Sequence, residues 1–258
     1  MPAHLELQDY VSAITRSGEV FRGAAERAGP AARVPTCPDW TVAELVAHQG
    51  MVHRWAAAVL RGDGDHDTER SHAEGAAAPD PLAWFSAGLA DLVETLRAAP
   101  DDAEAPVFLK NAPRPRLFWA RRQAHETTVH SVDALSAALG APPPTADAPV
   151  TPALAADGID ELLCGFLPRR KSRLRSPQPR TLLVRCDDTG HSWSLRISEE
   201  PVVAVAGAPA AAEPPDAVFS GTAVQLYLAL WNRGREVAVD GLPELVEQWR
   251  AQARVEWG

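Results

Sequence analysis

A proline-rich stretch divides the sequence into two parts of different character. It reads GAPPPTADAPVTP and spans residues 140–152. Before it, apolar residues recur every three or four positions, as they do in amphipathic helices. After it, short apolar runs bounded by turn residues alternate with helical segments, which is typical of strands and helices packed together. Because such a stretch usually forms a linker, we predict an α+β fold with two domains, residues 1–142 and 150–258.

Four helices are predicted in the first domain. Thr41 and Glu44 form a capping box at the start of the second helix. Residues 62–80 are polar and are predicted to be a mobile surface loop, and VPTCPDW at residues 34–40 is predicted to be an irregular segment stiffened by its prolines. Four helices of this length in roughly 140 residues indicate an antiparallel bundle. The predicted helices span residues 5–28, 41–62, 81–99 and 115–139.

The second domain is predicted to hold a small, mostly antiparallel sheet. Residues 181–188 and 191–198 indicate a β-hairpin that turns at Asp188-Thr189-Gly190. The basic run PRRKSRLRSPQPR, residues 168–180, is interrupted by proline and serine and is therefore predicted to be a solvated loop. The other predicted elements are strands at residues 201–207, 216–221 and 236–241 and helices at residues 222–234 and 242–255.

The composition argues against several classes of partner. Acidic residues outnumber basic residues by 34 to 25, which gives a net charge of −9, whereas nonspecific nucleic-acid binding needs a clustered positive surface. We find no run of about 18 apolar residues and no basic and apolar opening segment typical of secretion. Cys37, Cys164 and Cys186 lie far apart and fit a reducing compartment. We therefore expect a cytoplasmic protein, a monomer or a weak homodimer, that binds neither nucleic acid nor membrane.

The stretch AHETTVHSVDA, residues 124–134, is close to the H-E-x-x-H signature of zinc peptidases but does not match it. On a helix, residues five apart are separated by about 140°, so His125 and His130 point in different directions. Residues four apart are separated by only about 40°, so Glu126 and His130 share one face. This pair therefore forms either part of a metal site or an ordinary solvent-exposed polar pair.

A third metal ligand is expected from another helix. An apolar stripe on the second predicted helix contains one polar residue, His48, whereas His53 lies about 140° away and is expected to point elsewhere. Two histidine nitrogens and one carboxylate suit catalytic zinc with an open position, although a single histidine on such a stripe is more often a hydrogen-bonded core residue. Asp133, one turn after His130, either orients that histidine or lies on the surface. The stripe comprises Leu45, His48, Val52, Trp55 and Val59.

Two segments of the first domain, VPTCPDWTVAELVAHQGMVHRWA and RRQAHETTVHSVDA, resemble the mycothiol-dependent maleylpyruvate isomerase family. FSGTAVQLYLALWNR and VAVDGLPELVEQW in the second domain carry a looser likeness. The resemblance implies a DinB-like four-helix bundle followed by a small α+β domain. It also implies that His48, Glu126 and His130 hold a divalent metal, usually zinc. It further implies an active-site arginine from the second domain; Arg233 matches best, with Arg235 close behind, and either is equally suited to cap its helix.

The resemblance implies thiol chemistry with mycothiol as the thiol. Zinc with three protein ligands and one open position makes a bound thiol a thiolate at neutral pH. Attack on an electrophilic small molecule gives an isomerase if the thiol is expelled again, and an S-transferase if the adduct is kept. Two other functions stay open, a hydrolase in which the metal activates water and a non-catalytic metal- or ligand-binding protein. Three protein ligands argue against a closed structural site, which generally has four.

Overall fold

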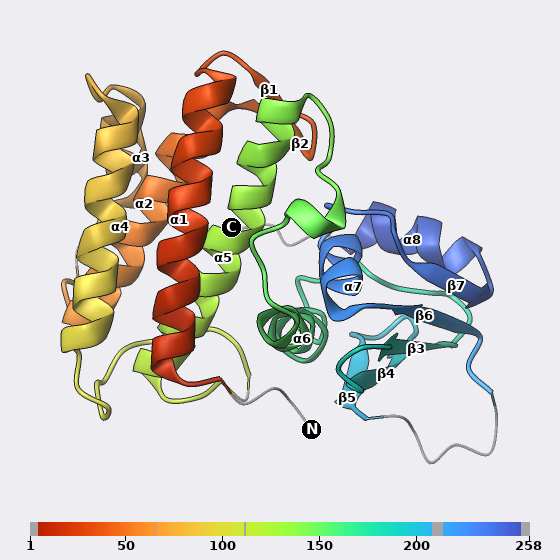
Figure 1. The fold of residues 1–258 in the computed structure, drawn as a ribbon. Coiled ribbons are helices and arrows are strands. Elements are labelled where there is room, and N and C mark those ends of the chain that lie inside the picture. Colours follow the sequence, from red (N-terminus) through yellow and green to blue (C-terminus); the bar gives the residue numbers. More distant parts are fainter. Residues whose placement is uncertain (1–4, 65, 111, 208–213, 254–258) are drawn as a thin grey trace. The chain divides into compact units, whose positions relative to one another are not determined.

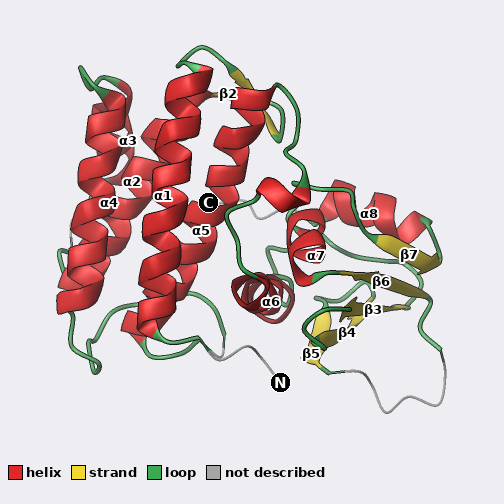
Figure 2. Ribbon diagram, viewed as in Figure 1, coloured by secondary structure: helices red, strands yellow, loops and turns green. Residues whose placement is uncertain are grey.

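The computed structural model describes residues 5–64, 66–110, 112–207 and 214–253. The chain divides into two compact units, a first of Glu6–Pro149 and a second that begins at Val150 and also includes Leu5. The first unit is helical and the second contains both helices and a sheet (Figures 1 and 2). Each of the four predicted long helices begins and ends within two residues of its predicted bounds. The helices of the first unit are α1 (Leu7–Ala28), α2 (Val42–Arg61), α3 (Thr68–Ala76), α4 (Pro81–Ala98) and α5 (Pro115–Leu139).

The four long helices form a bundle in which α1 and α5 run in one direction and α2 and α4 run in the other (Figure 1). Helices α2 and α4 are parallel, because contacts between them follow the same order along both helices. Arg54 donates to the Trp84 carbonyl, and Arg61, further along α2, donates to the Asp91 carboxylate, further along α4. Contacts between α2 and α5 run in opposite order, as expected for antiparallel neighbours. The segment between α2 and α4 therefore returns the chain to the end of the bundle where α2 begins.

That connecting segment was predicted to be a loop, and the prediction is wrong for its central part, which is helix α3. Asp67 caps α3 by accepting a hydrogen bond from the backbone N–H of Arg70. Near the end of α3, a Cβ on Gly75 would lie 2.5 Å from the ring of Trp84, so glycine permits this close approach. A short polar helix has no apolar periodicity, and for this reason the sequence pattern did not indicate it.

The segment between α1 and α2 also has regular structure. Strands β1 (Arg33–Val34) and β2 (Cys37–Thr41) pair as a short antiparallel hairpin. Its last residue, Thr41, is the N-cap of α2 and accepts a hydrogen bond from the Glu44 backbone N–H. The Glu44 carboxylate accepts in return from the Thr41 backbone N–H, which confirms the predicted capping box.

The second unit holds a five-stranded sheet in the order β5-β4-β3-β6-β7. Strands β3 and β6 pair in parallel, and the other three pairings among the described residues are antiparallel, so the sheet is mostly antiparallel as predicted. The predicted hairpin is β3 and β4. The strands are β3 (Arg180–Cys186), β4 (Ser192–Ile197), β5 (Val203–Ala206), β6 (Ala217–Gly221) and β7 (Ala238–Gly241).

Helices complete the second unit. Helix α7 (Ala223–Leu230) ends before its predicted bound because Asn232 adopts a left-handed conformation, with φ of 61°. Trp249 of α8 (Glu244–Gln252) donates from its indole N–H to the Leu230 carbonyl and anchors the last helix on α7. Helix α6 (Pro152–Asp160) and its π-helical continuation (Glu161–Phe166) lie outside the predicted elements. Among the described residues no helix has the length and apolar character needed to cross a membrane.

Candidate metal centre

Three potential metal ligands meet between α2 and α5. His48 lies in the second turn of α2, and Glu126 and His130 lie one turn apart in the middle of α5. Glu126 Oε1 lies 3.5 Å from His48 Nε2 and 3.3 Å from His130 Nε2. One ligand atom from each residue lies within 4.8 Å of the other two. The structure therefore brings together the trio that the helix geometry and the family resemblance indicated.

The atoms of this cluster fit a bound cation. His48 Nε2 and Glu126 Oε1 are buried and make no hydrogen bond, although a buried polar atom without a partner is costly. A divalent cation would satisfy both atoms together with His130 Nε2. Two imidazole nitrogens and one carboxylate oxygen are a common donor set for catalytic zinc, which keeps a further position open for water or substrate.

Two buried side chains of α5 hold the ligands in place. Asp133 lies one turn after His130, and its Oδ2 accepts a hydrogen bond from His130 Nδ1 at 2.9 Å. Arg122 lies one turn before Glu126, and its Nη2 donates to Glu126 Oε2 at 3.1 Å. Asp133 is fully buried and Arg122 is 1% exposed. Of these two residues, only Asp133 was predicted from the sequence. The signal for Arg122 was its spacing of four residues from Glu126.

The β1–β2 hairpin covers this part of the bundle with residues that the sequence analysis did not assign to the site. Thr36 donates from its hydroxyl to Asp133 Oδ1 at 2.5 Å, and the Cys37 thiol lies 3.5 Å from Asp133 Oδ2. The Trp40 ring lies against both ligand histidines, with its centroid 4.8 Å from that of His48 and 5.9 Å from that of His130. The one sequence feature that could have indicated these residues is their position, directly before the capping box of the helix that carries His48.

Charge in the cluster is organised around an ionised Glu126. Burial alone would raise the pKa of its carboxyl group, but contacts with His130 and His48 and the charge of Arg122 hold that pKa well below its usual range. Burial lowers the pKa of His48, which is therefore neutral at pH 7. Burial also acts against a proton on His130, but its contacts with Asp133 and Glu126 raise the pKa of His130 to about 9.

This arrangement predicts that metal binding displaces a proton. At pH 7 the metal-free His130 is protonated, whereas a ligand imidazole must be neutral. We expect metal affinity to rise about tenfold per pH unit from pH 7 to about 9 and then to level off. Calorimetry in buffers of different ionisation enthalpy should count one proton released per metal at pH 7. Affinity that is constant from pH 7 to 9, without proton release, would contradict the prediction.

Two further histidines near the cluster do not belong to it. His53 is fully buried, and its Nε2 lies within hydrogen-bonding distance of Gln49 and Thr127. Burial lowers the pKa of His53 to about 3, so it stays neutral. His125 is also fully buried and lies outside the ligand cluster. Both observations agree with the rotation of about 140° that separates each of them from a ligand histidine on its own helix.

The candidate arginines lie just after α7 in the second unit. Arg233 is half-buried, and its Nη1 donates to the carbonyl of Trp231 at 2.8 Å. Trp231 is the C-cap residue of α7, so Arg233 makes the helix-capping contact that the sequence analysis left open. Arg235 is exposed. A role for either arginine in substrate binding stays a prediction.

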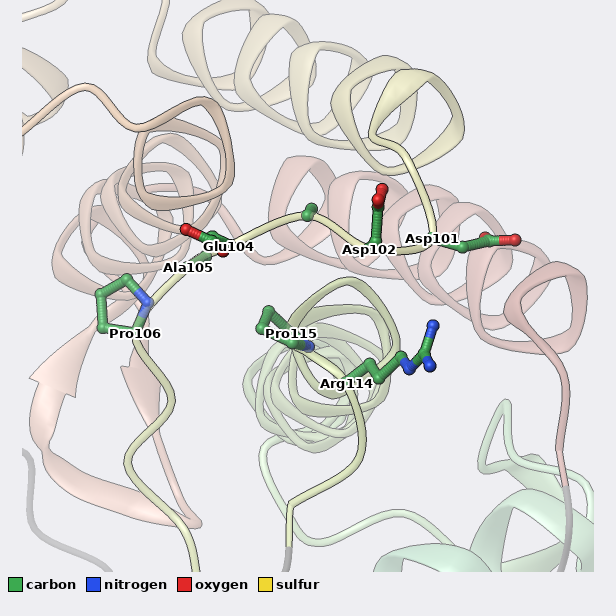
Figure 3. A pocket seen from close by; sticks show the side chains of 8 residues that line it. Asp101, Asp102, Glu104, Ala105, Pro106, Arg114 and Pro115 are labelled. Atoms are coloured by element: carbon green, nitrogen blue, oxygen red, sulfur yellow. The ribbon is translucent and has the colours of Figure 1, made fainter.

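A cavity of about 650 Å³ lies elsewhere in the first unit, where α4 leads into α5. Figure 3 shows Asp101, Asp102 and Glu104 on the segment after α4, near Arg114 and Pro115 at the start of α5. Pro115 precedes Glu126 by eleven residues, a helical rise of about 16 Å. This cavity is open and acidic, and none of the three clustered ligands lines it. The cavity is therefore separate from the histidine and glutamate cluster.

Comparisons with known proteins agree with this division of the chain. Two family models match it in succession: the mycothiol maleylpyruvate isomerase N-terminal domain over residues 11–135 and the MDMPI C-terminal domain over residues 153–248. The crystal structure of the mycothiol-dependent maleylpyruvate isomerase is similar, with a TM-score of 0.61 and 16% identity over 95% of this chain and 98% of that chain. A mutant of that enzyme, in which one histidine is replaced by alanine, is similar with a TM-score of 0.60 and 15% identity over the same shares of the two chains. No curated protein sequence matches this chain.

Proposed function

Because the chain belongs to the mycothiol-dependent maleylpyruvate isomerase family, we propose that it is a metal-dependent enzyme that uses mycothiol to attack an electrophilic small molecule. The observation that carries this proposal is the cluster of His48, Glu126 and His130, whose ligand atoms lie within 4.8 Å of one another. Three protein ligands suit a catalytic site rather than a closed structural one. The proposal is also supported by the fold, which is similar to that of the mycothiol-dependent maleylpyruvate isomerase.

In this proposal His48 Nε2, Glu126 Oε1 and His130 Nε2 hold a divalent cation, zinc by preference. When bound, such a cation lowers the pKa of a coordinating thiol so that the thiolate prevails at neutral pH. Three neighbouring side chains hold these ligands in position. Asp133 fixes the ring of His130 through Nδ1, Arg122 engages the second oxygen of Glu126, and Trp40 packs against both histidines.

The proposed reaction begins with addition of the mycothiol sulfur to a carbon of a conjugated double bond. A carbon–sulfur bond forms, the double bond becomes single, and its electrons move to the conjugated carbonyl oxygen as an enolate. Rotation about the single bond and expulsion of the thiolate then give the trans isomer and regenerate mycothiol. If a proton quenches the enolate and the adduct is released, the same step makes the protein a thiol S-transferase.

Arg233 is the residue that we propose for binding a substrate carboxylate or the enolate, because a guanidinium offers two parallel donors to such groups. We expect Arg233→Ala to raise KM for an anionic substrate and to leave metal content unchanged. Arg235→Ala is the matched control, since that side chain is exposed and close in sequence. Equal effects of the two substitutions would remove Arg233 from the proposal.

The function is tested by incubating the zinc-loaded protein with mycothiol and a panel of electrophiles that begins with maleylpyruvate. Mass spectrometry and NMR distinguish the outcomes. A trans product of unchanged mass supports an isomerase, and a product heavier by one mycothiol supports an S-transferase. Cleavage of the substrate into two products whose masses together exceed that of the substrate by one water, without mycothiol, would instead establish a hydrolase. Stoichiometric metal with none of these products across the panel would favour a non-catalytic binding protein.

A further inference from the structure

The carboxylate of Glu126 has two oxygens with different surroundings. Oε1 lies 3.5 Å from His48 Nε2 and 3.3 Å from His130 Nε2 and makes no hydrogen bond. Oε2 accepts a charge-assisted hydrogen bond from Arg122 Nη2 at 3.1 Å. One oxygen therefore faces the other metal ligands, and the second is already engaged by a cation of the protein.

Arg122 is positioned to hold Oε2 away from the other metal ligands. It lies one helical turn before Glu126 on α5, and the two side chains are 1% and 5% exposed. In such a setting an ion pair is screened by salt much less than a pair on the surface. Moving Oε2 towards a metal would break this buried, charge-assisted hydrogen bond, which is unfavourable. The geometry of Glu126 is therefore held from its own helix.

We propose that Arg122 is a positioning residue that limits Glu126 to one metal-ligand oxygen. A carboxylate binds a cation through one oxygen or through both, and the second mode occupies one more coordination position. By holding Oε2, Arg122 keeps that position available for a thiol or a substrate atom. Sharing the carboxylate charge with a guanidinium also makes Glu126 a weaker donor, so the cation stays more electrophilic. This inference rests on the proposed metal site.

A purely structural ion pair would have different consequences. Its loss would lower the stability of the protein without changing the coordination of a bound metal. The two roles are therefore separated by a spectroscopic measurement on the metal, made before any substrate is added. Cobalt(II) is a suitable probe because its visible absorption is stronger in four-coordinate than in five-coordinate sites, and geometry of this kind is diagnostic of the ligand set.

The test compares cobalt(II)-loaded wild type with Arg122→Met and Arg122→Lys. In Arg122→Met we expect weaker visible absorption, as Glu126 binds through both oxygens, and about tenfold weaker mycothiol binding, the scale on which residues that support metal ligands act. Lysine keeps the buried charge but not the planar fork, so Arg122→Lys should fold and should show a smaller change in the same direction. This second variant keeps the test decisive if Arg122→Met does not fold.

Arg116→Met is the matched control. Arg116 also lies on α5 but pairs with Asp101 and with backbone carbonyls at the end of α4. Its loss should lower stability and leave the cobalt spectrum unchanged. If wild type binds cobalt and both Arg122 variants keep its spectrum and its mycothiol affinity, the role of Arg122 is overturned while the proposed function stands. If wild type binds no divalent metal, both are overturned.

Discussion

Replacing His48 with alanine is expected to lower the affinity for zinc by about 100-fold or more and to reduce thiol-dependent activity to background. The substitution removes one of three protein ligands, and loss of residues that merely support ligands already costs about 10- to 100-fold. His48 is the better ligand to replace because Glu126→Ala would also break the buried ion pair with Arg122, and loss of such a pair destabilises the fold. Metal content and the dissociation constant, measured against a competing chelator, check the prediction.

The matched control for this experiment is His191→Ala. His191 lies in the second unit, next to β4, and is not part of the ligand cluster. We expect this variant to bind zinc as wild type does. Circular dichroism should show the same helix content in both variants, since His48 is a partly exposed side chain at the edge of the cluster. Full zinc occupancy in His48→Ala would remove His48 from the site.

Asp133→Asn is expected to weaken zinc binding by about 10- to 100-fold when measured above pH 9. Asp133 accepts hydrogen bonds from His130 Nδ1 and from the Thr36 hydroxyl, so its carboxylate fixes the ring and increases the basicity of the ligand nitrogen. The same carboxylate is a main cause of the raised pKa of His130. In the variant that pKa falls, and the pH dependence of zinc binding between 7 and 9 should flatten.

The two readouts of this variant separate positioning from stability. A residue that only holds the hairpin against α5 would lower the melting temperature and leave both the zinc affinity and its pH dependence unchanged. Thr36→Val is the matched control, because it removes a hydrogen bond to Asp133 while leaving the contact between Asp133 and His130 intact. We expect Thr36→Val to change zinc affinity by less than Asp133→Asn does. The reverse order would contradict the account.

The ligand cluster could be predicted from the sequence because residue spacing within a single helix determines which side chains share a face. Within one regular helix, spacing alone places Glu126 and His130 on one face and turns His125 away. His48 stood out because it interrupts an apolar stripe on α2. These two faces meet because α2 packs against α5. Periodicity does not predict this packing, whereas the family resemblance implied that His48, Glu126 and His130 share one site.

The residues around the ligands could not be predicted in the same way. A pair such as Arg122 and Glu126, four residues apart, is most often exposed and weakly stabilising, and only the buried position of α5 shows otherwise. Thr36 and Trp40 approach the ligands because the β1–β2 hairpin folds over the bundle, and a hairpin of so few residues has little periodicity. The parallel course of α2 and α4 depends on helix α3, whose polar sequence resembled a loop.

Binding of the mycothiol sulfur to the metal is tested most directly by X-ray absorption at the zinc edge on the zinc-loaded protein with and without mycothiol. Without mycothiol, we expect two histidine ligands and oxygen donors around the zinc. With saturating mycothiol we expect an added sulfur scatterer at about 2.3 Å, the usual zinc–sulfur distance. A zinc site that keeps only nitrogen and oxygen neighbours, at about 2.0–2.2 Å, in the presence of saturating mycothiol would contradict this expectation.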